Sequence, residues 1–243
     1  MTLTIRLRVG AAVLAGCAAL LVAAPAYAQT DPPPPGRVTD LKARADQAVK
    51  DRLTQIDMLS GRVNGAGADC GQNADVAGQL TSDKSGLQAL DATIQAETDG
   101  KKAVTEFHQI FTDFRIYWLE TPKAREVVVC DRASRAGVTM TALHEKIQTR
   151  VDEGKAKGYD VSGAQAALDD MGAKLTDATT HAKGAASSAA GLHPDKGDRS
   201  MLSSNFAALS KGRQDLHTAW DDLQAARHDA RRAIDELKNL HKG

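Results

Sequence analysis

Aromatic side chains are scarce in this sequence, at 4% of its 243 residues. Alanine, leucine and charged residues dominate instead. This composition favours long helices packed side by side over a β-rich globule. We therefore expect an all-α fold, an elongated antiparallel bundle of about five helices with coiled-coil-like packing.

The sequence also lacks an excess of positively or negatively charged residues. The whole chain has 31 basic and 31 acidic residues. Without the N-terminal segment 1–28, which contains Arg6 and Arg8, 29 basic and 31 acidic residues remain, a net charge of −2. Nucleic-acid binding needs a basic stripe that displaces counterions from phosphates. No nucleic-acid partner is therefore expected.

A long apolar run occurs once, in a segment that has the features of a secretory signal peptide over residues 1–28. Arg6 and Arg8 precede the apolar residues 9–24, Pro25 follows, and Ala26-Tyr27-Ala28 gives the small-x-small cleavage site. The run is short for a membrane span, which needs roughly 17–25 residues. We expect cleavage after Ala28, no transmembrane span after processing, and a secreted, extracellular or cell-envelope protein.

The same segment supports a second hypothesis, a lipoprotein anchored at Cys17. Leu14-Ala15-Gly16-Cys17 matches the lipobox, in which the cysteine is acylated and becomes the new N-terminus. The residues after Cys17 remain apolar as far as Ala24, whereas lipoproteins usually turn polar there. Cleavage after Ala28 is therefore preferred.

A proline-rich spacer is predicted for residues 29–36. Four consecutive prolines, residues 32–35, favour an extended polyproline segment. The helical bundle is then expected to occupy residues 37–243.

The clearest periodicity lies near the C-terminus. Two series recur every seven residues: Leu202, Leu209, Leu216, Leu223, Ala230 and Leu237, and Phe206, Arg213, Trp220, Arg227, Ile234 and His241. Together they predict a coiled-coil-like helix whose seam faces a neighbour, either within the bundle or in a homodimer through residues 202–241. The two arginines either pack their stems with the guanidinium in solvent or pair with carboxylates on the neighbouring helix.

Earlier segments also have helical spacing. Apolar seams occur in residues 38–63, 76–94, 129–147 and 161–192. Turn residues predict breaks at 64–69, 158–160 and 191–198, and a weaker one at 98–100.

Two cysteines support the prediction of a turn at residues 98–100. Cys70 and Cys130 are candidates for a disulfide in an exported protein, and Gly100 is the midpoint between them. A helical hairpin turning at Gly100 would bring both to the same height, whereas an uninterrupted helix would hold them tens of ångströms apart. We therefore predict a turn at Asp99-Gly100 and a Cys70–Cys130 disulfide. Pro122 then either kinks the returning helix or lies in the first turn of a new one.

Most of the aromatic residues gather in residues 107–118. Phe107, Phe111, Phe114, Tyr117 and Trp118 follow helical spacing, and this predicts a core stripe first. The functional alternative is a ligand or partner face formed by these five residues, centred on Tyr117 and Trp118.

The same region resembles a known group of proteins. Residues 111–119, Pro122-Lys123 and Asp131-Arg132 are similar to a segment of uncharacterised, Ala-rich secreted helical proteins of actinobacteria. The resemblance covers about the middle third of the chain. It implies a secreted helical protein and brings no activity with it.

Motifs for chemistry are absent from the sequence. None of the seven histidines has a second His or Cys at metal-ligand spacing, and neither Glu-x-x-His nor Gly-x-Ser-x-Gly occurs. We expect no catalytic residues, no metal and no cofactor. The leading hypothesis is an exported, non-catalytic interaction or spacer protein that binds an unknown protein or envelope polymer. The alternatives are a carrier that holds an apolar ligand beside the aromatic cluster, and an envelope enzyme with dispersed carboxylates.

Overall fold

The structure is a computed structural model that describes residues 35–240. These residues form six α-helices and one π-helical turn and contain no strand, which confirms the all-α fold. The elements are α1 (Pro35–Ala66), α2 (Asn73–Ala96), α3 (Gly100–Thr112), η1 (Ile116–Glu120), α4 (Thr121–Ala156), α5 (Ser162–Ala190) and α6 (Arg199–Asn239). The predicted signal peptide, Cys17 and residues 29–34 of the predicted spacer lie outside the described residues, and α1 begins at Pro35, inside that spacer.

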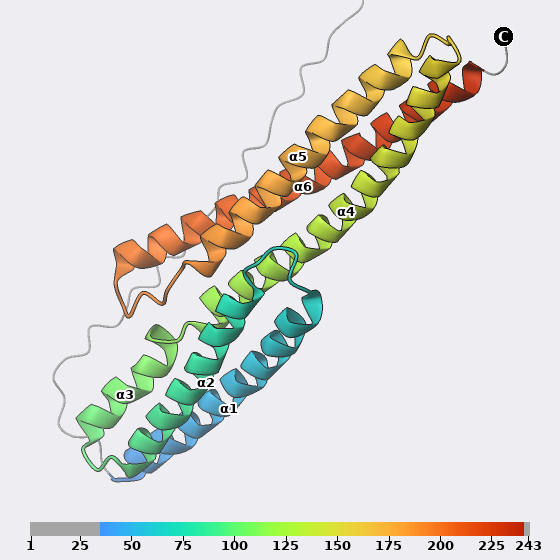
Figure 1. Ribbon diagram of the computed structural model, residues 1–243. Helices are drawn as coiled ribbons and strands as arrows, with labels where there is room; N and C mark the ends of the chain where they lie inside the picture. Colours follow the sequence, from blue (N-terminus) through green and yellow to red (C-terminus); the bar gives the residue numbers. More distant parts are fainter. Residues whose placement is uncertain (1–34, 241–243) are drawn as a thin grey trace, which may run out of the picture. The chain divides into compact units, whose positions relative to one another are not determined.

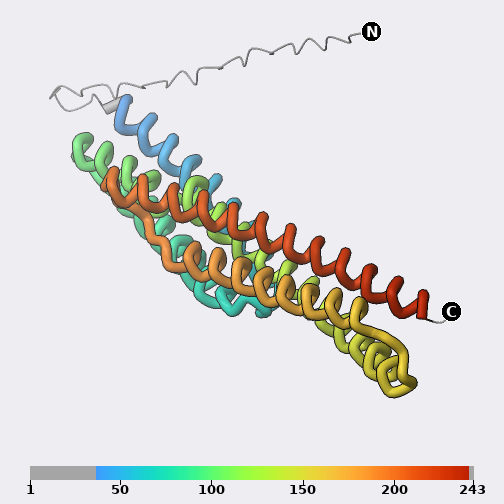
Figure 2. Tube along the Cα trace, turned by 90° about the horizontal axis from the view of Figure 1, so that it is seen from above, coloured from blue at the N-terminus to red at the C-terminus, as the bar shows by residue number. Residues whose placement is uncertain are grey.

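Helix α4 connects two sets of helices (Figures 1 and 2). Helices α1, α2 and α3 pack together, and α1 and α2 also pack against α4, while α5 and α6 pack against each other and along α4. The chain runs in the same direction through α4 and α6 and in the opposite direction through α5. Side chains from both sets meet where α4 begins.

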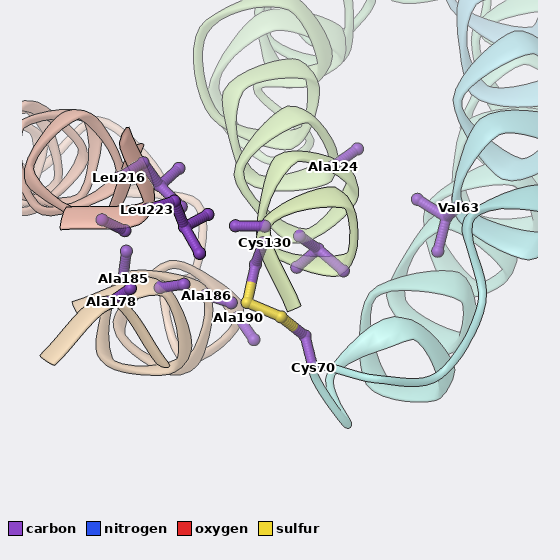
Figure 3. Packing of buried hydrophobic residues seen from close by; sticks show 14 of the residues in the cluster. Val63, Cys70, Ala124, Cys130, Ala178, Ala185, Ala186, Ala190, Leu216 and Leu223 are labelled. Carbon is purple, nitrogen blue, oxygen red and sulfur yellow. A yellow bond between two sulfur atoms is a disulfide. The ribbon is translucent and has the colours of Figure 1, made fainter. Parts of the chain in front are cut away.

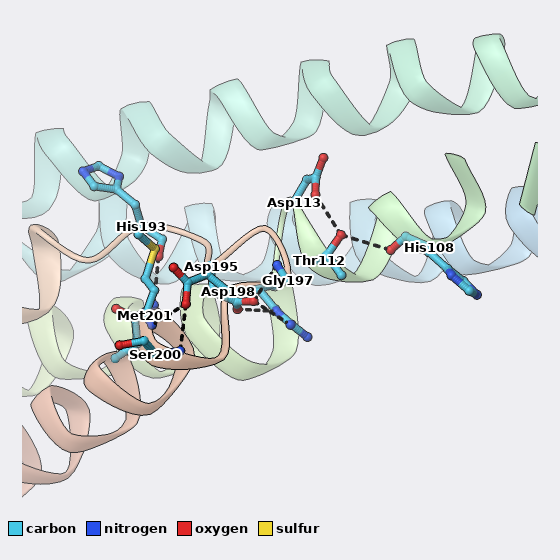
Figure 4. Close-up of polar contacts among 11 residues, drawn as sticks. His108, Thr112, Asp113, His193, Asp195, Gly197, Asp198, Ser200 and Met201 are labelled. Atoms are coloured by element: carbon cyan, nitrogen blue, oxygen red, sulfur yellow. Dashed lines mark hydrogen bonds and ion pairs between the residues drawn. The ribbon is translucent and has the colours of Figure 1, made fainter. Parts of the chain in front are cut away.

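The predicted breaks are all present. Helix α1 ends at Ala66, α4 ends before Gly158, and α5 and α6 are separated by residues 191–198. Asp99 caps α3 by accepting hydrogen bonds from Lys101 N at 2.8 Å and Lys102 N at 3.4 Å. Asp198 caps α6 in the same way, through Ser200 N and Met201 N (Figure 4). A side-chain oxygen that accepts these otherwise unpaired amides fixes where each helix starts.

One break was not predicted. Helix α3 ends at Thr112, and Arg115 adopts the left-handed conformation, with φ of 49°. The π turn follows and leads directly into α4, with Pro122 in the first turn of that helix. The Thr121 hydroxyl donates to Ile116 O at 2.9 Å and joins the two elements. The return from Gly100 is therefore three elements, and Pro122 lies in the first turn of a new helix, the second of the two predicted alternatives. The described residues thus form one α-helix more than the predicted number of about five.

The seam of α6 confirms one predicted series and corrects most of the other, in which Ile234 packs against the core and His241 lies outside the described residues. Leu209, Leu216, Leu223 and Ala230 are buried, as expected. The second buried series is Asn205, Gly212, Ala219, Ala226 and Ala233, one residue before each member of the predicted one. The facing positions of α5 are largely alanines, such as Ala178 and Ala185 (Figure 3). Small side chains on both helices allow a close approach that aromatic and arginine side chains would prevent.

The cysteine pair is at disulfide distance. The Cα atoms of Cys70 and Cys130 lie 6.0 Å apart, and the two sulfurs are joined (Figure 3). Cys130 is on α4, but Cys70 lies in the loop between α1 and α2. The placement of the two cysteines at disulfide distance and the turn at Asp99 are thus confirmed, whereas the expectation that both cysteines lie on helices is wrong for Cys70.

None of the helices formed by residues 35–240 has a stretch that is both long and apolar enough to cross a membrane.

Candidate interaction surface

Aromatic side chains lie at the surface of this protein rather than in its core. None of the eight described Phe, Tyr and Trp side chains is buried, and six are exposed: Phe111, Tyr117, Trp118, Tyr159, Phe206 and Trp220. The core consists instead of alanine, valine, leucine and isoleucine. The predicted core stripe is therefore wrong for Phe111, Tyr117 and Trp118.

The π turn explains the exposure of two of these residues. Ile116 and Leu119 point inward, and Leu119 packs with Ala189 of α5 and Leu209 of α6. Tyr117 and Trp118, between them, are 44% and 65% exposed. Because Ile116 and Leu119 point inward, the side chains of Tyr117 and Trp118 point towards the surface.

A buried ion pair holds the turn in place. Arg115 donates two hydrogen bonds to Asp195, from Nε at 2.6 Å and from Nη2 at 2.8 Å. Asp195, in the loop between α5 and α6, also accepts from Gly197 N at 2.9 Å (Figure 4). The hydrogen bonds from Arg115 and, to a smaller extent, from Gly197 lower the pKa of Asp195. Because the pair is bidentate and the Asp195 side chain is only 1% exposed, it fixes the π turn to the α5–α6 loop.

Rings on the two sides of the turn form contacts with neighbouring elements. The guanidinium of Arg52, from α1, lies 4.4 Å from the Phe111 ring centre and 5.2 Å from that of Tyr117. Trp118 meets Phe206 of α6 edge to face, with ring centres 6.0 Å apart. We refer to Phe111, Tyr117, Trp118 and Phe206 as the aromatic surface.

The structure divides the five predicted face residues. Phe111, Tyr117 and Trp118 belong to the aromatic surface, whereas Phe107 and Phe114 are half-buried against the core. Phe114 lies over Gly86 of α2, where an added Cβ would be 2.7 Å from the ring. Phe206 was not predicted to belong to this face, because its heptad spacing is also that of a residue in the seam of α6.

A buried lysine lies directly after the π turn. Lys123 is 1% exposed, and its Nζ donates to Glu120 Oε1 at 3.1 Å, to Leu192 O at 2.7 Å and to Gln79 Oε1. These acceptors belong to the turn, the α5–α6 loop and α2. Lys123 therefore ties three elements together beneath the aromatic surface.

Two carboxyl groups near Lys123 have pKa values raised above their ordinary range. Burial, and secondarily the neighbouring Glu120, raises the pKa of Asp83 to about 7, and burial also raises the pKa of Glu120. A groove of about 590 Å³ between α2 and the end of α5 is lined by Gln79 and His193, but by neither of these acids. The arrangement brings acids together without presenting them to a substrate.

A third carboxyl group is buried between α4 and α6. Glu126 is 2% exposed, and neither of its oxygens has a hydrogen-bond partner among the described residues. Its carboxylate lies over Gly212, where a side chain would overlap it. Burial raises its pKa to about 7, an effect that Arg213 partly opposes and Asp215 adds to.

Space for a ligand is lacking beside the aromatic surface. The cavity lined by Trp118, Leu119 and Phe206 measures about 10 Å³, which is the space of about one water molecule. Among residues 35–240, no group of three His, Cys, Asp or Glu side chains is placed to hold a metal ion. The aromatic surface thus has the form of a contact face rather than a pocket.

Known proteins supply no further guide, because no family model, no curated protein and no solved structure matches this chain. The resemblance to secreted actinobacterial proteins stays a prediction.

Proposed function

We propose that this protein is an exported, non-catalytic interaction module of the cell envelope that binds a partner protein or polymer through the aromatic surface. The observation that carries the proposal is the placement of the scarce aromatic residues: none of those described is fully buried, and four exposed ones form the aromatic surface around the π turn. Large aromatic side chains and arginine supply most of the binding energy at protein interfaces. Exposing them has no benefit for a solitary helical bundle.

Rigidity of the aromatic surface supports this role. The Arg115–Asp195 pair and the packing of Leu119 hold Tyr117 and Trp118 in one orientation. A surface that is ordered before binding loses little conformational entropy when a partner arrives.

Export is supported by two independent features. Residues 1–28 have the signal-peptide pattern, and Cys70 and Cys130 are paired in the way expected of an oxidising compartment. The lipoprotein hypothesis, with an anchor at Cys17, differs only in how the chain is retained.

The two alternative functions receive less support. A carrier of apolar ligands needs a cavity beside the aromatic cluster, and the space at Trp118 is that of one water. An enzyme needs its carboxyl groups in a cleft, and Asp83 and Glu120 do not line the groove near them.

Site-specific photo-crosslinking tests the proposal. A photoreactive phenylalanine analogue replaces Trp118 or Phe206 in the full chain, which is expressed in the cells that produce it. Tyr159 serves as the matched position, because it is a 42% exposed aromatic residue in the loop between α4 and α5. The protein is then recovered separately from the culture medium and from the envelope, and mass spectrometry identifies both the adducts and the N-terminus.

We expect the same adduct from positions 118 and 206 and none from position 159, with an N-terminus at Gln29. A second variant, Trp118→Ser with Phe206→Ser, should abolish co-purification of that partner. Adducts that are equal at all three positions would contradict the proposal, as would their complete absence.

A further inference from the structure

Four residues of the heptad series that was wrongly predicted to lie in the seam of α6 form an exposed row. Aromatic and arginine side chains alternate along this row. Phe206, Arg213, Trp220 and Arg227 follow one another every seven residues, and all four are exposed. At 1.5 Å per residue the row extends for about 32 Å along one face of the helix. Its first member, Phe206, contacts Trp118, so the row continues the aromatic surface.

The arginines of this row lack an ion-paired carboxylate, although Arg213 acts from beyond ion-pair distance on the buried Glu126 and partly opposes the rise in its pKa. Arg213 and Arg227 form no ion pair with any residue of the range 35–240. The residues three and four positions after each row member flank the row on the helix surface, and none of them is acidic. The face is therefore basic and aromatic at the same time, although the chain as a whole is neutral.

We propose that this face binds an acidic amphipathic helix of a partner protein, with apolar side chains against Phe206 and Trp220 and carboxylates against Arg213 and Arg227. The inference rests on the proposed function and names the partner's chemistry. A helix that packs along α6 presents side chains to it at heptad spacing. A partner helix with alternating apolar and acidic residues at that spacing would therefore match the alternating rings and guanidinium groups of α6.

Other occupants fit this face less well. A second copy of the chain would place each arginine against itself in a parallel pair. An antiparallel pair over the whole row would place Arg213 against Trp220 and Phe206 against Arg227, which leaves both arginines without an anion. An anionic polymer would satisfy the arginines and leave the rings of Phe206 and Trp220 without a partner. An acidic helix satisfies both kinds of side chain.

Binding of a designed peptide tests the proposal. The probe is a helical peptide of about 28 residues, four heptads, with Leu, Glu, Leu and Glu at successive seam positions. The readout is tryptophan fluorescence, since Trp118 and Trp220 are the two tryptophans of the chain and both belong to this face. We expect saturable binding, and Arg213→Glu with Arg227→Glu should weaken it at least about 10-fold.

Matched controls separate charge from placement. Arg62→Glu with Arg150→Glu makes the same change in net charge at exposed arginines of α1 and α4, outside the row, and should leave binding unchanged. A peptide with lysine in place of glutamate should bind the Arg213→Glu, Arg227→Glu protein and restore the signal. Such charge reversal is not expected if the row variants merely perturb the fold.

Three outcomes would overturn the inference. These are equal binding of a peptide with the same composition in scrambled order, equal binding of poly-glutamate, and no saturable change up to millimolar peptide. If crosslinks at Trp118 persist in any of these cases, the proposed function stands and the partner has another chemistry. If both the crosslinks and the peptide binding fail, the proposed function fails as well.

Discussion

At the scale of single residues, buried ionisable side chains govern how this protein responds to pH. Glu126 and Asp83 each have a pKa of about 7, raised by burial from 4.5 and 3.8. A carboxyl group with a raised folded-state pKa stabilises the fold while it is protonated. At a pH between the ordinary pKa of the carboxyl group and about 7, the folded state keeps a proton that the unfolded state has released. Stability from this source is therefore full below the ordinary pKa and is lost as the pH rises to about 7.

Glu126→Gln tests this dependence, because glutamine resembles the protonated side chain at every pH. We expect the variant to equal the parent near pH 4.5 and to be the more stable protein at pH 8. Urea unfolding at both values measures the difference. Glu145→Gln, at an exposed position of the same helix, should show no such divergence. A parallel pH dependence for Glu126→Gln and the parent would refute the prediction.

Lys123 is the second residue with a marked expected effect. Lys123→Met keeps the length of the side chain but leaves Glu120 buried without a cation, so we expect a loss of about 3–5 kcal/mol in the free energy of unfolding. Adding Glu120→Gln should recover part of this loss, because it removes the uncompensated charge. Lys84→Met removes an exposed partner of Asp57 and should cost less than about 1 kcal/mol. Equal losses in the two single variants, measured by urea unfolding, would contradict the role given to Lys123.

At the scale of the elements, the join between η1 and the α5–α6 loop determines where the aromatic surface points. Asp195→Ala removes both hydrogen bonds from Arg115 and the one from Gly197, and we expect a loss of about 2–4 kcal/mol. Faster hydrogen exchange in residues 113–120 should accompany it, because the turn loses its anchor. Asp69→Ala breaks the exposed pair with Arg135 and should leave exchange in that segment unchanged. Unaltered exchange in Asp195→Ala would show that the packing of Leu119 alone is sufficient.

At the scale of the whole molecule, the disulfide limits the unfolded chain. Cys70 and Cys130 are separated by 60 residues, so a bond between them removes a large part of the unfolded chain's freedom. We expect reduction to lower the free energy of unfolding by about 2–5 kcal/mol. Urea unfolding with and without a reducing agent measures this, and the Cys70→Ser, Cys130→Ser variant should be insensitive to the reagent. Identical transitions for the parent under both conditions would mean that the cysteines are not bonded.

Much of the fold was predictable because it depends on local chemistry. Turn residues determined where α1, α4 and α5 end, and Asp99 and Asp198 provide the side-chain oxygens that start α3 and α6. The cysteine pair was predictable from its symmetry about Gly100. The π turn was not, because its anchor is the contact of Arg115 with Asp195, a residue 80 positions away.

The heptad period of α6 was determined by the sequence alone, since residues seven apart lie on one face of a helix whatever surrounds it. Two adjacent series shared that period, however, and periodicity cannot distinguish them. The alanines of α5 decided which series is buried, because a close approach of two helices admits Gly212 and Ala219 but excludes Phe206 and Trp220. The tertiary structure thereby turned a predicted seam into an exposed row of rings and guanidinium groups.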